Sequence, residues 1–119
     1  MEHLGNTLLF PVYWRVAVFP EPAGEQCFIG KTYELSPVGA GIYCDFNLPE
    51  KISFLLHLEI PAITKDTHGN DLEIVARVTH TTLHSQYGFR IGMLFQQFEG
   101  EGKVLLTRTL TQRFKPGHR

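Results

Sequence analysis

Hydrophobic and polar positions alternate in short stretches along most of the chain, which is typical of β-strands. In PVYWRVAVF, residues 11–19, the side chains of Val12, Trp14, Val16 and Val18 fall on one face. Similar stretches recur, separated by segments rich in proline, glycine and small polar residues. The pattern predicts six strands, over residues 11–19, 27–35, 42–46, 52–60, 72–84 and 87–95.

The end of the chain has a different period. In KVLLTRTLTQRF, residues 103–114, the apolar positions lie near helical spacing, and Arg113 stands in the last turn, where a basic side chain favours a helix. Six closely spaced strands and one helix predict a mostly β fold, either a sandwich or a small barrel. We expect a single domain over residues 1–119, with the barrel over about 10–96 and the helix over about 103–114. The expected inner side chains are Trp14, Val16, Ile42, Leu56, Val78 and Phe95.

Composition and charge exclude several classes of protein. Hydrophobic residues make up 43% and charged residues 19% of the chain, as in ordinary globular proteins. The 11 Lys and Arg nearly balance the 12 Asp and Glu, so the chain lacks the basic field of a nucleic-acid-binding protein. No apolar run approaches the roughly 20 residues of a membrane-spanning helix, and the first residues do not resemble a signal peptide. We therefore expect a cytoplasmic protein, in which Cys27 and Cys44 are buried thiols.

The residue types that catalyse reactions or bind metals do not occur in recognisable combinations. Ser36 lacks the flanking glycine of a nucleophile elbow. His80 and His84, if they share one strand, lie about 13 Å apart, which is too far for one metal ion. The glycines at 39 and 41 lack the third glycine of a dinucleotide-binding loop. The sequence therefore predicts no catalytic residues, no metal site and no bound cofactor.

The segment ELSPVGAG, residues 34–41, combines an acidic side chain, a hydroxyl and flexible backbone between two predicted strands. Exposed amides and a serine hydroxyl in a tight turn can accept a phosphate or the edge of a base. The simpler interpretation is a plain β-turn that needs glycine for a positive φ. Spacing alone leaves both interpretations open.

Two short motifs stand in the order and spacing of a known domain family. The first is Glu34-Leu35-Ser36-Pro37-Val38-Gly39, which is similar to (Asp/Asn)-x-Ser-x-x-Gly, and the second is Gly92-Met93-Leu94-Phe95, which is similar to Gly-x-x-Phe. With the predicted strands and helix, nearly the whole chain resembles the PilZ family. These are bacterial cytoplasmic domains, many of which bind the second messenger cyclic di-GMP. The resemblance implies a six-stranded antiparallel PilZ-like β-barrel with a C-terminal α-helix.

The resemblance also implies a set of ligand-binding residues. In the family, the serine, the glycine and the polar residue before them contact the guanine and phosphate groups of cyclic di-GMP. The corresponding residues here are Glu34, Ser36 and Gly39, and we add the neighbouring Gly41.

The second half of the family's site is incomplete in this chain. PilZ domains that bind the messenger usually carry Arg-x-x-x-Arg just before or at the first strand, whereas Arg15 is the only arginine in that region. If Arg15 matches the second arginine of the motif, Pro11 stands at the first position, and if the motif lies further upstream, no arginine remains. Each missing charge-assisted contact costs about 1.5–3 kcal/mol. We therefore expect cyclic di-GMP to bind weakly, on the order of tens of micromolar or poorer, and to depend on Arg15 as the only nearby guanidinium.

The resemblance predicts a signalling adaptor without enzymatic activity. It would bind cyclic di-GMP weakly and regulate motility, pilus or exopolysaccharide machinery through an unidentified protein partner, as a monomer or weak dimer. One alternative is a PilZ-like interaction domain that does not bind the messenger, as in type IV pilus assembly. A second is a small-barrel enzyme, although no set of residues supplies a nucleophile, a base and oxyanion donors together.

Overall fold

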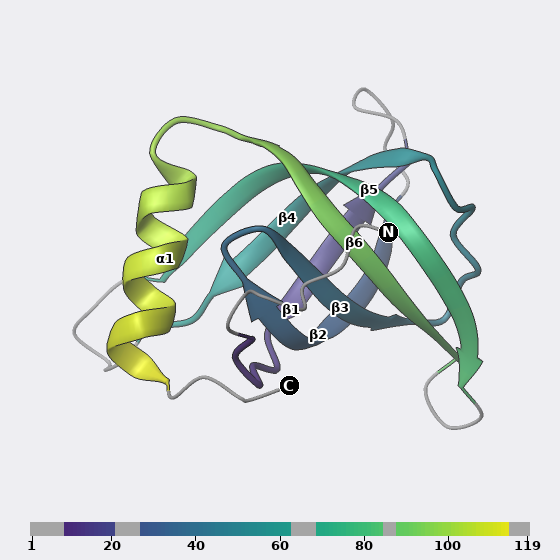
Figure 1. The fold of residues 1–119 in the computed structure, drawn as a ribbon, viewed down its shortest axis with the longest axis horizontal. Coiled ribbons are helices and arrows are strands. Elements are labelled where there is room, and N and C mark those ends of the chain that lie inside the picture. The colour runs from purple at the N-terminus through teal and green to yellow at the C-terminus, as the bar shows by residue number, and fades with distance from the viewer. Residues whose placement is uncertain (1–8, 21–26, 63–68, 85–87, 115–119) are drawn as a thin grey trace.

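The structure is a computed structural model that describes residues 9–20, 27–62, 69–84 and 88–114. Within these ranges the chain forms six strands and one helix (Figure 1). They are β1 (Arg15–Phe19), β2 (Phe28–Ser36), β3 (Gly39–Cys44), β4 (Ser53–Ile60), β5 (Asn70–His84), β6 (Gly88–Phe98) and α1 (Gly102–Arg113). The first strand therefore begins four residues later than predicted. Tyr87, the predicted start of the last strand, lies outside the described residues.

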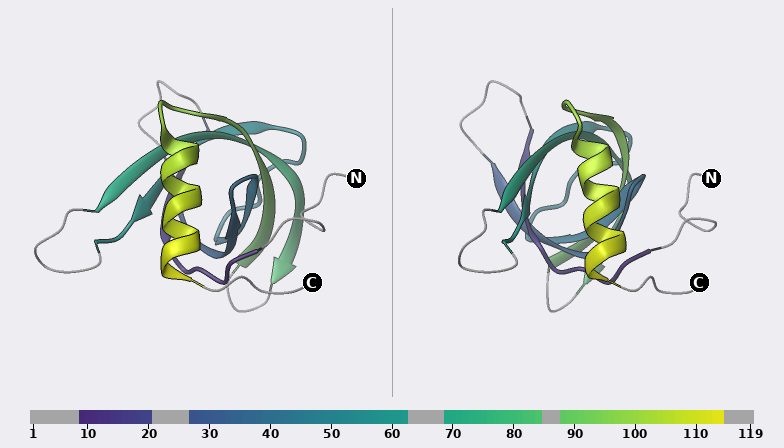
Figure 2. Two further views of the ribbon diagram at one scale, coloured as in Figure 1. Left: turned by 60° about the vertical axis from the view of Figure 1, so that its left-hand side comes forward. Right: turned by 90° about the vertical axis from the view of Figure 1, so that its left-hand side faces the viewer.

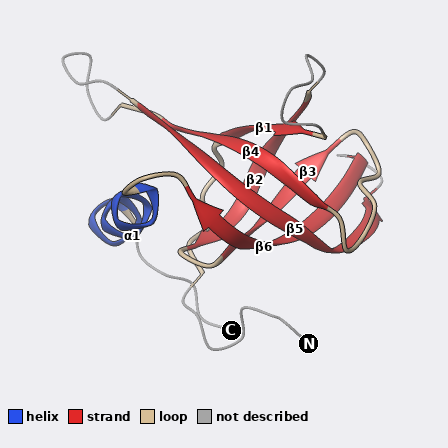
Figure 3. Ribbon diagram, turned by 90° about the horizontal axis from the view of Figure 1, so that it is seen from above, coloured by secondary structure: helices blue, strands red, loops and turns tan. Residues whose placement is uncertain are grey.

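The six strands close into one barrel in the order β1-β2-β3-β6-β5-β4. Every neighbouring pair is antiparallel, including β1 with β4, which completes the ring. Figures 1 and 3 show the strands crossing around a common interior, with the helix outside it. This confirms the six-stranded antiparallel barrel with a C-terminal helix that the resemblance implied.

Alternation along the strands fills the interior of the barrel. In β4, for example, Phe54, Leu56, Leu58 and Ile60 are buried, whereas the residues between them are partly or fully exposed. Five of the six predicted inner residues are buried, namely Trp14, Val16, Ile42, Leu56 and Val78. Burial of an aliphatic side chain of this size contributes about 1.5–3 kcal/mol, so the interior is the main source of stability.

Phe95 is the exception, because it is only partly buried and packs against the core from outside. The register of the β5–β6 pair shifts between Val75 and Ala76, where Ala76 faces Phe95 and Val75 faces Gln97. Such an irregularity inserts an extra residue and breaks the strict alternation on which the prediction rested. The ring of Phe95 instead packs edge-on against Phe98, with the ring centres 5.4 Å apart.

The residues before β1 are held against β2. Phe10 and Leu35 exchange two backbone hydrogen bonds, of 2.8 and 2.9 Å. The buried hydroxyl of Thr32 accepts a hydrogen bond from the Trp14 amide (2.8 Å) and donates one to the Val12 carbonyl. Val12 and Trp14 therefore enter the core, while Tyr13 between them points outward and is 64% exposed.

The helix α1 lies across one end of the barrel, as Figure 2 shows. Its residues Leu106 and Leu110 are fully buried, and the ring of Phe114, just after the helix, packs edge-on against Trp14 at 5.8 Å. Arg113 donates a hydrogen bond of 2.7 Å to the carbonyl of Pro61 after β4. The helix thus matches the predicted span within one residue at each end. No helix in the described part of the chain is long and apolar enough to cross a bilayer.

The two cysteines differ in their surroundings. Cys44 on β3 is 2% exposed, whereas Cys27, just before β2, is only partly buried. The prediction of two buried thiols is therefore right for Cys44 and wrong for Cys27. Cys27 lies before the paired part of the strand, where the barrel does not enclose it.

Candidate functional site

The turn between β2 and β3 is shorter than the predicted break over residues 36–41. Only Pro37 and Val38 form it, and β3 begins at Gly39. Gly39 and Gly41 therefore belong to a strand, and neither is among the described residues with a positive φ. At neither position does an unusual backbone conformation require glycine, and at Gly41 the small size serves close packing against Tyr33.

Ser36 stabilises this turn from within. Its side chain is completely buried, and its hydroxyl oxygen accepts hydrogen bonds from the amides of Val38 (3.1 Å) and Gly39 (3.2 Å). The Val38 carbonyl in turn accepts a hydrogen bond of 2.8 Å from the Phe95 amide on β6. The hydroxyl and the two amides that could accept a phosphate thus already bond to one another.

Gly41, the last residue of the predicted site, lies under an aromatic ring. It pairs with Glu34 on β2 and with Gly92 on β6. A Cβ atom added to Gly41 would collide with the ring of Tyr33, which lies across it. A ligand could reach the backbone of Gly41 only if this ring moved.

Arg90 on β6 places a guanidinium beside Glu34. Its guanidinium carbon lies 5.0 Å from the centre of the Tyr33 ring, and it donates a hydrogen bond to the Tyr33 hydroxyl. The negative charge of Glu34 contributes to raising the pKa of both Tyr33 and Arg90. The ring of Tyr43 lies 4.7 Å from that of Tyr33, so two phenol rings and one cation gather on the outer face beside the turn.

These contacts change the acidity of two groups. Burial raises the pKa of Tyr33, although the hydrogen bond from Arg90 works in the opposite direction. The pKa of Arg90 is raised, first by its hydrogen bond to Tyr33. At neutral pH Tyr33 is therefore a neutral acceptor and Arg90 a permanent cation.

Arg15 lies elsewhere on the outer face. It stands opposite Lys31 in the β1–β2 register, and its guanidinium is 3.5 Å from the carboxylate of Glu59 on β4. Since Lys31 precedes Ser36 by five residues, Arg15 is about 16 Å from the turn along β2. The expectation that Arg15 is the only guanidinium near the turn is therefore wrong, because Arg90 is closer to Glu34.

The structure brings together Glu34, Ser36, Gly39 and Gly41, and adds three residues that the sequence did not single out: Tyr33, Tyr43 and Arg90. Tyr33 could have been found as the neighbour of Glu34. Arg90 could not, because it joins the site only through the β3–β6 pairing, which places it opposite Tyr43.

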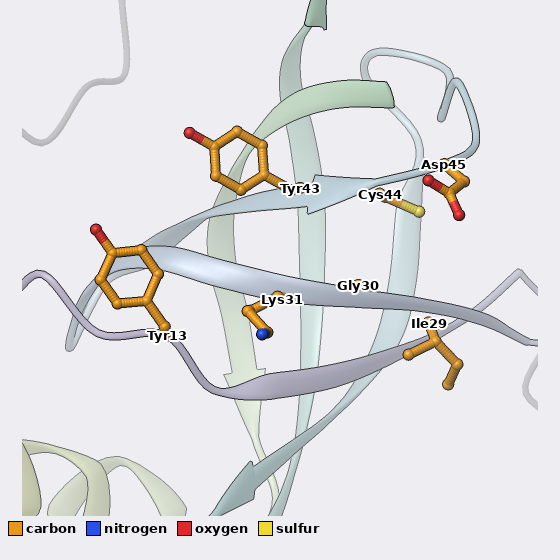
Figure 4. A pocket seen from close by; sticks show the side chains of 7 residues that line it. All are labelled: Tyr13, Ile29, Gly30, Lys31, Tyr43, Cys44 and Asp45. Carbon is orange, nitrogen blue, oxygen red and sulfur yellow. The ribbon is translucent and has the colours of Figure 1, made fainter. Parts of the chain in front are cut away.

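A groove of about 640 Å³ lies next to these residues on the same outer face (Figure 4). It is lined by Tyr13, Ile29, Gly30, Lys31, Tyr43, Cys44 and Asp45, and we call it the β2–β3 groove. Figure 4 shows the rings of Tyr13 and Tyr43 at one end and Ile29 and Asp45 at the other, with Lys31 between the two ends. Among the described residues, no three His, Cys, Asp or Glu side chains gather as metal ligands would.

No protein-family model matches the sequence, and neither does any curated protein. Solved structures do match. One of them is the structure of the Bacillus subtilis inhibitor of motility, MotI/DgrA, with a TM-score of 0.76 and 13% sequence identity over 95% of this chain. The two proteins share the fold. The match covers 51% of the MotI/DgrA chain, so this chain spans about half of that protein's length.

Proposed function

We propose that this chain is a PilZ-type regulatory adaptor without enzymatic activity. It binds cyclic di-GMP weakly beside the β2–β3 turn and regulates motility, pilus or exopolysaccharide machinery through contacts with a protein partner. The observation that carries the proposal is the Glu34-to-Gly39 motif on this barrel, next to Tyr33 and Arg90. The shared fold with a protein described as an inhibitor of motility supports it.

The outer face offers the chemistry that a cyclic dinucleotide needs. The guanidinium of Arg90 is exposed and can fork onto a phosphate, as arginine does in charge-assisted pairs. The phenol rings of Tyr33 and Tyr43 offer faces on which a guanine can stack, a contact worth about 1–3 kcal/mol per base.

The same geometry argues for low affinity. The Ser36 hydroxyl already accepts two hydrogen bonds, Arg90 must leave Tyr33 to bind a phosphate, and Arg15 is paired with Glu59. Since each charge-assisted contact contributes about 1.5–3 kcal/mol, an incomplete set corresponds to a Kd on the order of tens of micromolar or poorer.

Isothermal titration calorimetry with cyclic di-GMP tests the proposal. We expect Arg90→Gln to weaken binding about tenfold or more, since it removes one charge-assisted contact. Arg108→Gln, an exposed arginine on α1, is the matched control and should bind like the unmodified chain. If Arg15→Ala weakens binding and Arg90→Gln does not, the ligand lies over β1 and β2 instead. Submicromolar binding, or binding unaffected by both substitutions, would contradict the proposed site.

A PilZ-like interaction domain that does not bind the messenger is the second candidate. The observation that favours it is the internal bonding of Ser36, which leaves its hydroxyl buried. In that case the titration gives no heat up to about 1 mM, and Ser36→Ala lowers only stability, by about 1–2 kcal/mol.

A further inference from the structure

The β2–β3 groove contains one cation and one anion that do not neutralise each other. Lys31 and Asp45 both line it and both are exposed. Lys31 faces Tyr43 in the β2–β3 register, and Asp45 lies two residues beyond Tyr43, so the two backbones are about 7–8 Å apart. Within the described part of the chain, neither side chain forms an ion pair. The groove thus offers two opposite charges to whatever occupies it.

Exposed apolar side chains surround these charges. Tyr13 is 64% exposed and Ile29 is 45% exposed, and both line the groove. Phe46, directly after Asp45, is 50% exposed, with its ring stacked 4.2 Å from that of Phe28. Exposed apolar side chains grouped with charges mark protein–protein contact sites, and tyrosine is among the residues that contribute most there.

Gly30 lines the groove with its backbone, because a side chain at this position would point to the inner side of the barrel, toward Cys44, and not to the face of Ile29 and Lys31. A second groove of about 660 Å³ continues past the same residues toward Arg15 and Glu59, where the charges are already paired. Lys31 and Asp71 also line this second groove, whereas Asp45 lines only the β2–β3 groove of the two. None of the lining residues of the β2–β3 groove belongs to the Glu34-to-Gly39 motif, and the groove shares Tyr43 with the proposed cyclic di-GMP site.

We propose that the β2–β3 groove is the interface of a homodimer with two-fold symmetry. A small anion would be attracted by Lys31 but repelled by Asp45. A small cation would be attracted by Asp45 but repelled by Lys31. The occupant must carry both charges at matching positions. A second copy of this chain does so by symmetry, because a two-fold rotation places Lys31 of each copy against Asp45 of the other. Because Lys31 pairs with Tyr43 and Gly30 with Cys44 in the β2–β3 register, the same rotation brings Ile29 of each copy near Ile29 of the other, and Tyr43 near Tyr43.

Sedimentation velocity over about 10 µM to 1 mM tests the dimer. We expect reversible association with a Kd on the order of 100 µM, as for a small transient interface, that weakens as salt is added because exposed charges are screened. Lys31→Glu and Asp45→Lys each place two like-charged pairs in the interface, and each should weaken the dimer about tenfold or more. Lys103→Glu, an exposed lysine on α1, is the control for the change of charge and should leave the dimer unchanged.

Mixing the two weakened variants is the decisive experiment. A dimer of one Lys31→Glu chain and one Asp45→Lys chain pairs Glu with Lys at one contact and Asp with Lys at the other. The mixture should therefore associate about as strongly as the unmodified chain, and so should the double variant K31E/D45K. Native mass spectrometry identifies the heterodimer, and circular dichroism verifies that each variant is folded. An unmodified chain that stays monomeric at 1 mM, or folded variants that do not associate when mixed, would overturn the proposal.

Discussion

Gly41 on β3 and Gly92 on β6 face each other in register, and a ring from a neighbouring strand lies over each of them. Tyr33 covers Gly41 from β2, and His80 covers Gly92 from β5. The β2–β3 pair and the β5–β6 pair each shift register at these rings. Such a shift changes the direction in which a side chain points. The absence of side chains at two facing positions thus shapes the outer face beside the turn.

The glycines of the barrel strands should differ in their tolerance of alanine. A Cβ atom at Gly30 would lie 2.5 Å from the backbone oxygen of Tyr43, which cannot move without disturbing β3. The three atoms nearest to a Cβ at Gly92 all belong to the ring of His80, which is exposed and can rotate away. We expect Gly30→Ala to lower the free energy of unfolding by about 1–3 kcal/mol and Gly92→Ala by less than about 1 kcal/mol. Urea unfolding measures both, and equal losses would contradict this explanation.

Val78 on β5 provides a test of the barrel interior. It is fully buried, so Val78→Asp places an unpaired carboxylate in the core and should cost roughly 3 kcal/mol or more. Arg77→Asp, one residue earlier on the exposed face, is the matched control and should change stability by less than about 1 kcal/mol. Thermal unfolding compares the two. A melting temperature that is lowered equally in both variants would mean that the alternation along β5 is wrong.

The elements formed by short-range patterns could be predicted from the sequence. The strand predicted over 52–60 is β4, and the helix predicted over 103–114 is α1, because burial in both follows the local period of the chain. The sequence does not decide whether Gly39 and Gly41 lie in a strand or in a turn, because a glycine gives the same local signal in both. The structure places both in β3, where the Tyr33 ring needs the space over Gly41.

The candidate site could be predicted only in part, because some of its residues are close in sequence and others are brought in by the pairing of distant strands. Glu34, Ser36 and Gly39 are close in sequence, so their motif is visible without a structure. Arg90 lies more than fifty residues later and reaches Glu34 only because β3 pairs with β6 and not with β4. The pairing of distant strands in a barrel is not encoded in any local pattern.

The two thiols should react at different rates. Thiolate is the nucleophile in disulfide exchange, and burial raises the pKa of Cys44 while also shielding its sulfur. With Ellman's reagent at pH 8, we expect two phases, with Cys44 at least about tenfold slower than the partly exposed Cys27. Cys27→Ser should leave only the slow phase, and in denaturant both thiols should react in the fast phase. A single fast phase of two thiols in the folded protein would be inconsistent with a buried Cys44.

The contact between Tyr33 and Arg90 predicts a dependence of stability on high pH. Burial raises the pKa of Tyr33 above the ordinary value of 10.0, so the folded state holds this proton more tightly than the unfolded state does. Stability from the neutral phenol is therefore fully present below pH 10 and is lost as the pH rises through the pKa of the folded state. At pH 7, Tyr33→Phe should cost about 0.5–1.5 kcal/mol, the value of one hydrogen bond.

That difference between the unmodified chain and Tyr33→Phe should shrink between pH 9 and pH 11, because only the unmodified chain has a phenol at this position that ionises on unfolding. Urea unfolding at several pH values measures it. Absorbance at 295 nm gives an independent measurement, since the phenolate of Tyr33 should appear at a higher pH than that of an unfolded tyrosine. Arg90→Gln removes the hydrogen bond that lowers the pKa of Tyr33, so it should move this titration to still higher pH. A stability difference that is constant from pH 7 to pH 11, or a Tyr33 titration that Arg90→Gln leaves unchanged, would show that the two side chains are not in contact.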